Sequence, residues 1–505
     1  MHQRIRNASL AERLMTAEEA ACLIKPGMTV AMSGFTGAGY PKAVPQALAA
    51  LMERENDAGS DFRIKVLTGA STAPELDGVL AKAKGMELRL PFQSDPALRD
   101  QINAGDLDYI DIHLGHVAQH TWFGFFGAID IAVVEVAGIL EDGRLIPSSS
   151  VGNNKTWLEQ ADKVILEVNR WQPEELEGMH DVYYGTALPP HRKPIMLTEP
   201  DDRIGVPYLS VDQEKVVAVV ETDAPDRNSP FKAPDETSQQ IAGHILDFFE
   251  HEIKRGRMPE KLLPLQSGVG NVANAVLAGL ATGGYEGLTA YTEVIQDGML
   301  DLLKTGVLRM ASATSFSLSA AGIEEFKSNI GFYRDRILLR PQEISNHPET
   351  IRRLGCIALN GMIESDIYGN VNSTHIAGTK MMNGIGGSGD FARNSYLSVF
   401  MSPSVAKGGQ ISGIVPMVSH VDHTEHDTMV VVTEQGLADM RGLSPKQRAR
   451  LVIEKCAHPD YRPLLEDYFE RACRDSFGKH TPHLLGEALS WHERFVETGS
   501  MRPAL

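Results

Sequence analysis

The chain of 505 residues has little cysteine, no long apolar run and no cluster of positive charge. Its four cysteines are scattered and form no CxxC pair, which argues against a zinc ribbon or a dithiol redox site and indicates a reducing compartment. No apolar run approaches the roughly 18 residues of a membrane span, so we expect no membrane association. The N-terminal segment lacks the apolar core of a secretion signal, and Glu12, Glu18 and Glu19 argue against a transit peptide. We therefore expect a cytoplasmic protein.

The charge balance is acidic, with 66 Asp and Glu against 48 Lys and Arg and a formal net charge of −18. Because no dense basic block offsets this excess, we expect no nucleic-acid partner. An anionic small substrate would have to meet a local basic group. Hydrophobic residues make up 42% and charged residues 23%, which is typical of a globular protein with buried sheets.

The length predicts more than one domain, because single cores stop growing at about 250–300 residues. Thr16 and Glu19 form a capping box that should open a helix ending at Lys25, and residues 28–33, MTVAMS, have the pattern of a strand. Residues 221–236 are rich in Pro, Asp and Ser. We interpret them as a linker, and the domains it separates would be an N-terminal domain at 1–220 and a C-terminal domain at 237–505.

The two halves resemble each other. Residues 33–48, SGFTGAGYPKAVPQAL, match 267–280, SGVGNVANAVLAGL, once a short gap is allowed, and each reads as strand, glycine turn and helix. Residues 141–153 and 365–379 each have a tight glycine turn between extended segments. Val/Ile-rich strands that alternate with helices imply a mainly parallel, helix-covered sheet. The predicted fold class is therefore α/β, with two tandem, structurally similar open domains and a site at strand carboxyl ends, at their interface.

Two motifs invite competing interpretations. The glycine-rich segment 268–273, GVGNVA, with Glu293 about 20 residues later, resembles a dinucleotide fingerprint, but a single GxGxxA is also an ordinary strand-to-helix turn. Glu293 in TAYTEVIQDGML is a carboxylate at the end of an apolar strand. It could accept hydrogen bonds from a loop or act in chemistry.

Each of three further sequence features allows two interpretations. The loop 383–398 has four glycines between 384 and 389 and could either bring backbone close to a ligand or connect surface elements. HVDHTEHD at 420–427 resembles a metal site, but extended alternation would split its side chains, so we favour a polar loop and expect no metal. Arg227, in DRNSPF, could bind a carboxylate through two hydrogen bonds or form a surface ion pair.

Seven segments in order resemble the acetyl-CoA hydrolase/transferase family of class I CoA-transferases, in particular bacterial members that move CoA between succinyl-CoA and acetate. They are SGFTGAGYPK, LPLQSGVGNVANAV, YTEVIQDGML, RRLGCIALNGMIESDIYGNVNST, MMNGIGGSGDFAR, VTEQGLADMRGLSP and AHPDYRP, and they extend over nearly the whole chain. The resemblance implies the CoA-transferase class I fold, with two tandem α/β domains and a homodimer.

The resemblance also implies the catalytic residues. Glu293 would be the nucleophile that becomes a glutamyl-CoA thioester. The side chain of Asn346 and the backbone N–H of Gly387 would form the oxyanion hole for its carbonyl. Glu434 would be the second active-site carboxylate, which positions and desolvates the nucleophile.

Substrate contacts follow from the same resemblance. Val269 and Gly270 would offer backbone donors to the acyl oxygen, and Arg227 would bind the distal carboxylate of a succinyl group. CoA would lie along Leu263, Pro264, Leu265, Gln266 and Ser267, with Ile363, Asn383, Gly387 and Lys407 as further contacts.

The implied reaction is a reversible ping-pong transfer of CoA between short carboxylic acids, with acyl-CoA, acetate and succinate as substrates. No cofactor is expected, because CoA is both substrate and covalent intermediate. One alternative is an acetyl-CoA hydrolase on the same scaffold, in which water replaces the acceptor acid. The others are a nicotinamide-dependent oxidoreductase built on GVGNVA and a non-catalytic acyl-CoA-binding protein, for which Glu293 would be dispensable.

Overall fold

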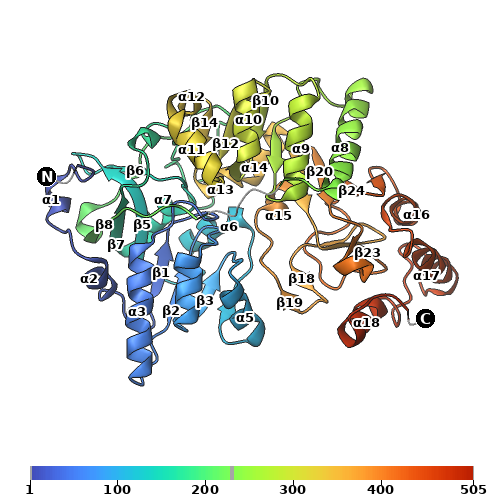
Figure 1. Cartoon of the computed structure of the whole chain (residues 1–505), viewed down its shortest axis with the longest axis horizontal. Coiled ribbons are helices and arrows are strands. Elements are labelled where there is room, and N and C mark those ends of the chain that lie inside the picture. Colours follow the sequence, from blue (N-terminus) through green and yellow to red (C-terminus); the bar gives the residue numbers. More distant parts are fainter. Residues whose placement is uncertain (1–2, 228–232, 504–505) are drawn as a thin grey trace. The chain divides into compact units, whose positions relative to one another are not determined.

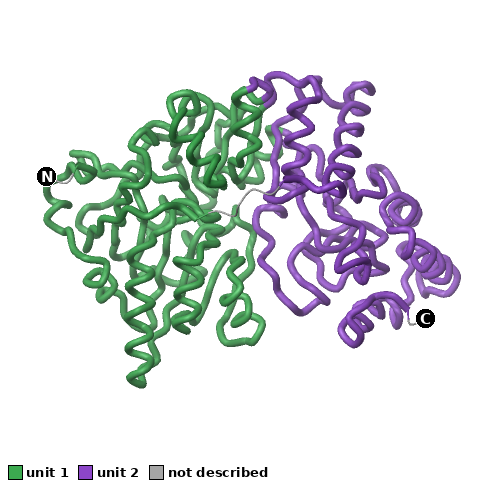
Figure 2. Tube along the Cα trace, in the orientation of Figure 1, with its two compact units in different colours: residues 1–231, 289–304, 308–354 green, residues 232–288, 305–307, 355–505 purple. Residues whose placement is uncertain are grey.

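The computed structural model describes residues 3–227 and 233–503. Two compact units are present, unit 1 with residues 1–231, 289–304 and 308–354 and unit 2 with residues 232–288, 305–307 and 355–505 (Figure 2). Each unit is therefore made of segments that are separated in the sequence, and the chain passes between the units more than once. The predicted linker, 221–236, includes residues 228–232, which lie outside the described residues, and the predicted domain boundaries stay a prediction.

The N-terminal part of unit 1 is built on a mainly parallel sheet. Its strands are β1 Thr29–Met32, β2 Ile64–Leu67, β3 Met86–Leu90, β4 Asp108–Tyr109, β5 Ile129–Ile139, β6 Leu145–Pro147, β7 Ala161–Asn169 and β8 Val216–Thr222. They are arranged in the order β4-β3-β2-β1-β5-β7-β8, and β6 pairs with β5. In the register of β1, Val30 lies opposite Val66 on one side and Ile131 on the other. The nearly continuous apolar sequence of β5 is typical of a strand covered on both faces.

Helices and short turns connect these strands. They are α1 Ala8–Ala11, α2 Ala17–Ala21, α3 Ala43–Asp57, the π-turn η1 Pro74–Gly78, α4 Val79–Lys82, α5 Pro96–Ala104, α6 Leu114–Trp122, α7 Asn154–Gln160, and the 3₁₀ turns η2 Glu174–Leu176 and η3 Gln213–Lys215. Helix α3 is labelled in Figure 1. It buries Leu48 and Met52 in one apolar cluster with Val30 and Val66 of the sheet. Burying each such side chain contributes roughly 1.5–3 kcal/mol, so this face fixes α3 on the sheet.

The predicted capping box is confirmed. The Thr16 side chain accepts from the Glu19 N–H, and the Glu19 carboxylate accepts from the Thr16 N–H. Helix α2 nevertheless ends at Ala21, earlier than the predicted Lys25. The N–H groups of the two residues after Cys22 bond to carbonyls three residues back, so the last turn tightens out of α-helical geometry. The strand predicted at 28–33 is confirmed as β1.

A second α/β series begins in unit 1. Its elements are β10 Leu288–Tyr291, β11 Val294–Gln296, α10 Asp297–Thr305, β12 Leu308–Ala313, β13 Ser315–Ser317, α11 Ala320–Ser328, α12 Ile330–Arg334, β14 Ile337–Leu339, α13 Gln342–Ser345 and α14 Pro348–Leu354. Strands β10, β12 and β14 are neighbours in this order, and β11 pairs in parallel with β13.

Unit 2 contains a second set of parallel strands. Its helices are α8 Glu236–Lys254, α9 Asn271–Thr282, α15 Ser388–Asn394, the 3₁₀ turn η4 Lys407–Gly409, α16 Pro445–Cys456, α17 Arg462–Asp475 and α18 Ser490–Thr498. Its strands are β9 Leu265–Ser267, β15 Ile357–Gly361, β16 Glu364–Asp366, β17 Val371–Asn372, β18 His375–Ile376, β19 Lys380–Met381, β20 Leu397–Met401, β21 Val405–Ala406, β22 Ile411–Ser412, β23 Ile414–Val415, β24 Val430–Thr433 and β25 Gly436–Asp439. Strands β9, β15, β20 and β24 pair in parallel in this order, and β25 adds to β24 in the antiparallel sense.

The internal repeat is confirmed. Strands β9-β15-β20-β24 follow one another as β1-β5-β7-β8 do, and β10-β12-β14 follow as β2-β3-β4 do. The predicted strand, glycine turn and helix are β1–α3 in one copy and β9–α9 in the other. The two predicted glycine turns, at Gly143 and Gly369, join the antiparallel pairs β5–β6 and β16–β17, and both glycines have positive φ, 88° and 98°. The chain is an α/β protein with two structurally similar series.

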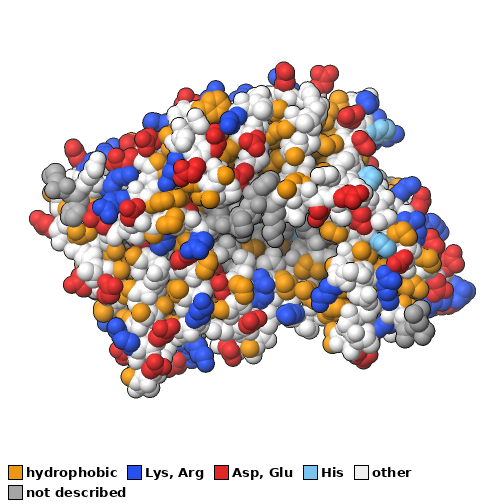
Figure 3. All heavy atoms as spheres, in the orientation of Figure 1, with side chains coloured by type: hydrophobic (Ala, Val, Ile, Leu, Met, Phe, Trp, Pro, Cys, Tyr) orange, Lys and Arg blue, Asp and Glu red, His pale blue; other side chains and the backbone are white. Residues whose placement is uncertain are grey.

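None of the helices in the described ranges combines the length and apolar character needed to span a lipid bilayer. On the face drawn in Figure 3, Asp and Glu side chains are interspersed with Lys and Arg side chains. That face therefore offers no extended basic surface to a phosphate backbone among the residues described.

His180 is a buried histidine whose charge state links the fold to pH. Its side chain has no exposed surface, and its Nε2 donates to the Ser148 carbonyl at 2.9 Å. Burial lowers the pKa of His180 to about 4, and the nearby Arg203 guanidinium acts in the same direction. The neutral ring is therefore required in the folded state.

We predict that His180 makes the protein less stable as the pH falls from 7 to 5. The unfolded chain, with a histidine pKa near 6.5, binds a proton in this window that the folded chain does not bind, so stability present above pH 6.5 is lost. The loss should be ~2 kcal/mol larger in the wild type than in His180→Gln, measured from urea unfolding at the two pH values. His191→Gln, at an exposed histidine, should follow the wild type. An equal loss in His180→Gln would contradict the prediction.

Candidate active site

Glu293 lies just beyond the end of β10, on a backbone that is held from two sides. Its carbonyl accepts hydrogen bonds from the N–H groups of Thr314, at 3.0 Å, and Ser315, at 3.2 Å. The next residue, Val294, is buried in an apolar cluster with Phe35, Ala70 and Leu114. The Glu293 side chain itself is half-buried. The sequence thus places a carboxylate at a rigid strand end.

Asn346 is one side chain that the structure brings to Glu293. Its Nδ2 donates to Glu293 Oε1 at 3.2 Å, and the Asn346 side chain is fully buried. Its Oδ1 has no hydrogen-bond partner within the described part of the chain. Asn346 caps α13, whose first residue Gln342 is fixed by hydrogen bonds to Gly152 and Leu114. A donor is therefore pre-positioned at one carboxylate oxygen.

The topology explains why these residues meet. Glu293 follows β10, Thr314 follows β12, and Asn346 follows β14 through α13. These three strands are neighbours, so the segments that follow them emerge at one edge. Ligands of open α/β sheets bind at this carboxyl edge.

Glu434 lies in unit 2, just after the end of β24. Ser404 donates to its two carboxylate oxygens through its N–H, at 2.8 Å, and its hydroxyl, and Gln435 Nε2 adds a hydrogen bond of 3.0 Å. Burial alone would raise the pKa of Glu434, but the hydrogen bonds from Ser404 and Gln435 outweigh it and lower the pKa. Glu434 is therefore an anion at neutral pH.

Lys407 belongs to the same segment as Ser404. It is exposed and has φ of +46°, and the two glycines after it also have positive φ. The turn is held from the C-terminal side, because the Gly409 carbonyl accepts from Tyr461 Oη and Arg502 Nε, both at 2.9 Å. Non-glycine residues in this conformation cost of order 1 kcal/mol or more, and such strain concentrates at functional sites.

The predicted CoA segment Leu263–Ser267 ends in β9. Leu265, Gln266 and Ser267 are buried and pair with β15, and Gln266 bonds to Leu359 N and Asn360 Oδ1. Leu263 and Pro264, before the strand, are partly exposed. The side chains of these three strand residues are therefore packed within the protein.

The remaining predicted contacts lie on loops and turns of unit 2. Val269 is 61% exposed, and Gly270, with φ of 137°, is the N-cap residue of α9. Ile363 lies between β15 and β16, and its N–H bonds to Asn372. Gly387 caps α15, and Asn383 is on the loop before it. The glycine-rich loop is thus packed against protein at Gly384 and Gly387, which are buried.

The HVDHTEHD segment at 420–427 does not gather into a metal site, since the described residues contain no group of three or more His, Cys, Asp or Glu side chains that could hold an ion. His423 is buried, lies 4.6 Å from the Phe400 ring and has its Nε2 3.1 Å from Ser388 Oγ. Asp422 instead accepts hydrogen bonds from the segment that follows β17. The side chains are split between surroundings, as alternation predicts.

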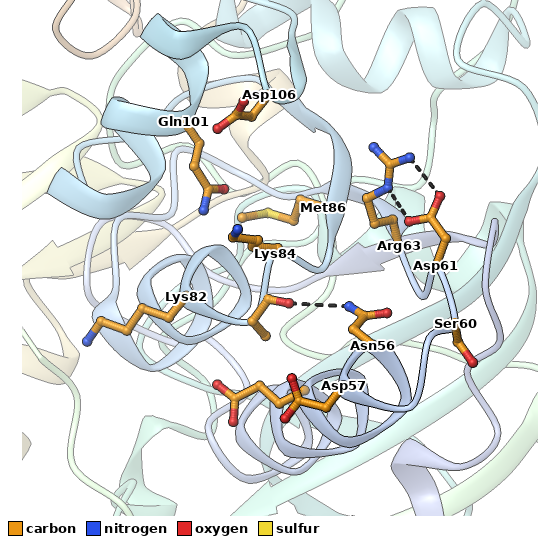
Figure 4. Close-up of a pocket in the computed structure, with 12 residues that line it drawn as sticks. Asn56, Asp57, Ser60, Asp61, Arg63, Lys82, Lys84, Met86, Gln101 and Asp106 are labelled. Carbon is orange, nitrogen blue, oxygen red and sulfur yellow. Dashed lines mark hydrogen bonds and ion pairs between the residues drawn. The ribbon is translucent and has the colours of Figure 1, made fainter.

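A hollow of about 630 Å³ in unit 1 lies away from this edge. It is lined by Arg63 and Met86, next to or at the first residues of β2 and β3, and by Lys82 and Lys84 (Figure 4). Arg63 is already bound to Asp61 by two hydrogen bonds of 2.7 and 2.8 Å. The hollow lies at the amino ends of the strands, and the charged side chains that line it are paired or of mixed sign. We therefore assign it no function.

Arg227 is paired in unit 1. Its guanidinium lies 2.6 Å from Glu75, and 62% of its side chain is exposed. The residue before it, Asp226, accepts from Lys42 Nζ at 2.9 Å and from Gly39 N at 3.1 Å. Lys42 also bonds to Glu135 at 2.6 Å.

Sequence reasoning identified Arg227 and Glu434 but not their partners. Glu75 and Ser404 lie in segments with no distinguishing pattern. For Lys42 alone a weak signal existed, because a lysine at the start of an apolar helix next to a glycine turn needs a buried partner.

Two family models match the chain. The acetyl-CoA hydrolase/transferase N-terminal domain matches residues 1–221, and the C-terminal domain of the same name matches residues 322–469. The chain is 51% identical to a succinyl-CoA:acetate CoA-transferase of Clostridium kluyveri, over 99% of this chain and 92% of that one. It is 47% identical to a propanoyl-CoA:succinate CoA transferase of Escherichia coli, over 96% and 98% of the chains, and 46% identical to an acetyl-CoA hydrolase of Schizosaccharomyces pombe, over 99% and 98%.

Solved structures share the fold. RipA from Yersinia pestis superposes with a TM-score of 0.68 at 22% identity, covering 91% of this chain and 97% of RipA. The predicted α/β architecture and the family resemblance are both confirmed. The chain belongs to the acetyl-CoA hydrolase/transferase family of enzymes.

Proposed function

We propose that the chain transfers CoA reversibly from succinyl-CoA to acetate through a covalent intermediate on Glu293. The observation that carries this proposal is the 3.2 Å hydrogen bond from Asn346 Nδ2 to Glu293 Oε1 at a strand end. A carboxylate whose backbone is fixed and whose oxygen meets a buried amide donor is suited to attack a carbonyl. The names of the transferase relatives support the choice of substrates.

In the first half of the reaction, a Glu293 oxygen attacks the thioester carbonyl of succinyl-CoA. The C–S bond breaks, CoA leaves as a thiolate, and a mixed anhydride of Glu293 and succinate remains. The thiolate then attacks the Glu293 carbonyl, which forms the glutamyl-CoA thioester and releases succinate. Acetate repeats these steps in reverse, so the free energy of the thioester is kept.

Each step passes through an oxyanion that needs a donor. The Asn346 amide fits this role for the Glu293 carbonyl, because it is buried and already within hydrogen-bond distance. Loss of one such donor typically costs ~10²–10³ in rate. Acyl groups move between oxygen and sulfur with no net oxidation, so we propose that no metal or redox cofactor takes part.

The groups of unit 2 keep the roles that the resemblance implies. Glu434 is proposed as the second carboxylate, and its hydrogen bonds to Ser404 keep it charged. Val269, Gly270 and Gly387 would offer backbone N–H groups to the reacting oxygens. CoA would contact the Leu263–Ser267 segment, Ile363, Asn383 and Lys407, whose ammonium supplies charge for an anionic ligand. We extend the proposal to a cytoplasmic homodimer.

Hydrolysis is the second candidate, because one close relative is named an acetyl-CoA hydrolase. The two reactions differ in the acceptor, which is water in one and acetate in the other. Incubation with succinyl-CoA, with and without acetate, separates them when acetyl-CoA and free CoA are measured independently. Transfer predicts acetyl-CoA that depends on acetate and little free CoA, whereas hydrolysis predicts free CoA without acetate.

We predict that Glu293→Ala folds but loses transfer, because no other carboxylate occupies its position. When the wild type receives succinyl-CoA without acetate, its intact mass should rise by the mass of one CoA less one water, and borohydride should then inactivate it by reducing the thioester at Glu293. Acetate should protect the enzyme by discharging the CoA. Glu286→Ala, at an exposed glutamate of the same segment, should behave as wild type. An adduct on another residue, or kinetics of a ternary complex, would overturn the assignment.

We predict that Ser404→Ala shifts the acidic limb of the kcat/KM profile to higher pH. The lost hydroxyl stabilises the Glu434 carboxylate, so its removal raises the pKa of that group and protonates it at a higher pH. Ser402→Ala is the matched control, because the Ser402 hydroxyl bonds to Pro403 O instead. Identical profiles for the wild type and Ser404→Ala would remove Glu434 from the reaction.

We predict that Arg227→Ala raises the KM for succinate and succinyl-CoA more than the KM for acetate. A guanidinium can hold the second carboxylate of a dianion, which acetate lacks. Arg54→Ala, at an exposed arginine of α3, should leave all three values unchanged. An equal effect on all substrates would reassign Arg227 to packing.

A further inference from the structure

The guanidinium of Arg227 already has a carboxylate partner inside unit 1. Glu75, in the first turn of η1, lies 2.6 Å from it, and the other Glu75 oxygen accepts from Tyr40 Oη at 3.0 Å. The exposed fractions differ, with 62% for the Arg227 side chain and 19% for Glu75. The carboxylate is therefore the fixed partner and the guanidinium the exposed one.

The backbone of Arg227 is fixed although its side chain is exposed. Its N–H donates to Gly37 O at 2.9 Å, and the preceding Asp226 is bound by the buried Lys42 and by Gly39 N. Gly39 has φ of +65°, and a Cβ there would come within 2.2 Å of Ser150 Oγ, so the turn requires glycine. The guanidinium can thus change partners without displacing the chain.

A short series of contacts connects this turn with the nucleophile. The residue before Gly37, Thr36, donates to Phe316 O at 3.1 Å, and the residue before that, Phe35, accepts from Ser315 Oγ at 3.0 Å. Ser315 N in turn bonds to the Glu293 carbonyl. Arg227 and Glu293 are therefore held on one contiguous framework within unit 1.

The exchange of succinate for acetate poses a charge problem at such a site. One pocket must accept a dianion in one half-reaction and a monoanion in the other, and an arginine that is satisfied by the first would be left unpaired by the second. We propose that Glu75 is a specificity-determining residue whose carboxylate holds Arg227 when a monocarboxylate is bound and releases it to the distal carboxylate of a dicarboxylate. This inference rests on the proposed function.

The contacts imply that little free energy is needed for Arg227 to change partners. Because 62% of the Arg227 side chain is exposed, solvent screens its ion pair with Glu75, and a substrate carboxylate can displace Glu75. Glu75 keeps its hydrogen bond from Tyr40 after Arg227 leaves. Burial, together with the Glu75 and Asp226 carboxylates, raises the pKa of Tyr40, so the phenol stays protonated and remains a donor.

Glu75→Gln tests the inference. The amide keeps an acceptor for Tyr40 but removes the competing charge, so the KM for succinate should fall about two- to fivefold while the KM for acetate and kcat with acetate stay unchanged. A thermal shift produced by succinate alone, without CoA, should appear at a correspondingly lower concentration. An unchanged succinate KM, or equal changes for both acids, would overturn the inference.

Two further variants separate the inference from its alternatives. In Arg227→Ala/Glu75→Gln the gain should vanish, because Glu75 acts through Arg227, and a persisting gain would overturn it. Tyr40→Phe removes the hydroxyl that donates to Glu75 but keeps both charges, so a succinate-selective gain there would assign the effect to the position of Glu75 and not to its charge. If the wild type moves no CoA from succinyl-CoA to acetate, the proposed function fails. If it does, and only the Glu75→Gln selectivity is missing, the inference alone fails.

Discussion

The carboxyl edge of the first sheet depends on the ion pairs of the buried Lys42 ammonium. The Lys42 side chain is 1% exposed and lies between Glu135 of β5 and Asp226. Burial would lower the pKa of Lys42, but the two carboxylates outweigh it and raise the pKa, whereas burial raises that of Glu135. Because an uncompensated buried charge costs roughly 3–5 kcal/mol, all three groups must keep their geometry. These contacts fix the central strand β5, the glycine turn at Gly39 and the segment that carries Arg227 relative to one another.

A fixed backbone with a partly or fully exposed side chain is found at Glu293 and Lys407, as at Arg227. The carbonyl of Glu293 is bound by two N–H groups, and the turn of Lys407 is held by Tyr461 and Arg502, while both side chains retain exposed surface. Catalytic groups act through geometry that is set before the substrate arrives, since reorganisation during the reaction would raise the barrier. The parallel sheets supply that geometry by ending neighbouring strands at one edge.

Local patterns predicted the elements well and the partners poorly. The capping box at Thr16, the hairpin turns at Gly143 and Gly369 and the strand end at Glu293 follow from residues close in sequence, so spacing predicted them. The partners of Arg227 and Glu434 come from distant segments, and Ser404 is separated from Glu434 by 30 residues. Only the tertiary fold brings these groups together. A hydrogen bond between residues that are distant in the sequence produces no periodic pattern that spacing could reveal. The early end of α2 shows the same limit, since tertiary context overrides propensity at helix ends.

A ping-pong exchange also constrains the electrostatics of the acid pocket. In the proposed reaction both acids use it in turn, and a permanently unpaired arginine would bind the dianion strongly enough to slow the release of succinate. A guanidinium neutralised by a protein carboxylate removes part of this bias, because the dianion must first displace Glu75. The charges of Arg227 and Glu75 then cancel before either acid binds, and the difference between the acids is confined to an ion pair whose guanidinium is exposed. Selectivity between short acids can therefore change through one residue on η1 without altering Glu293 or Asn346.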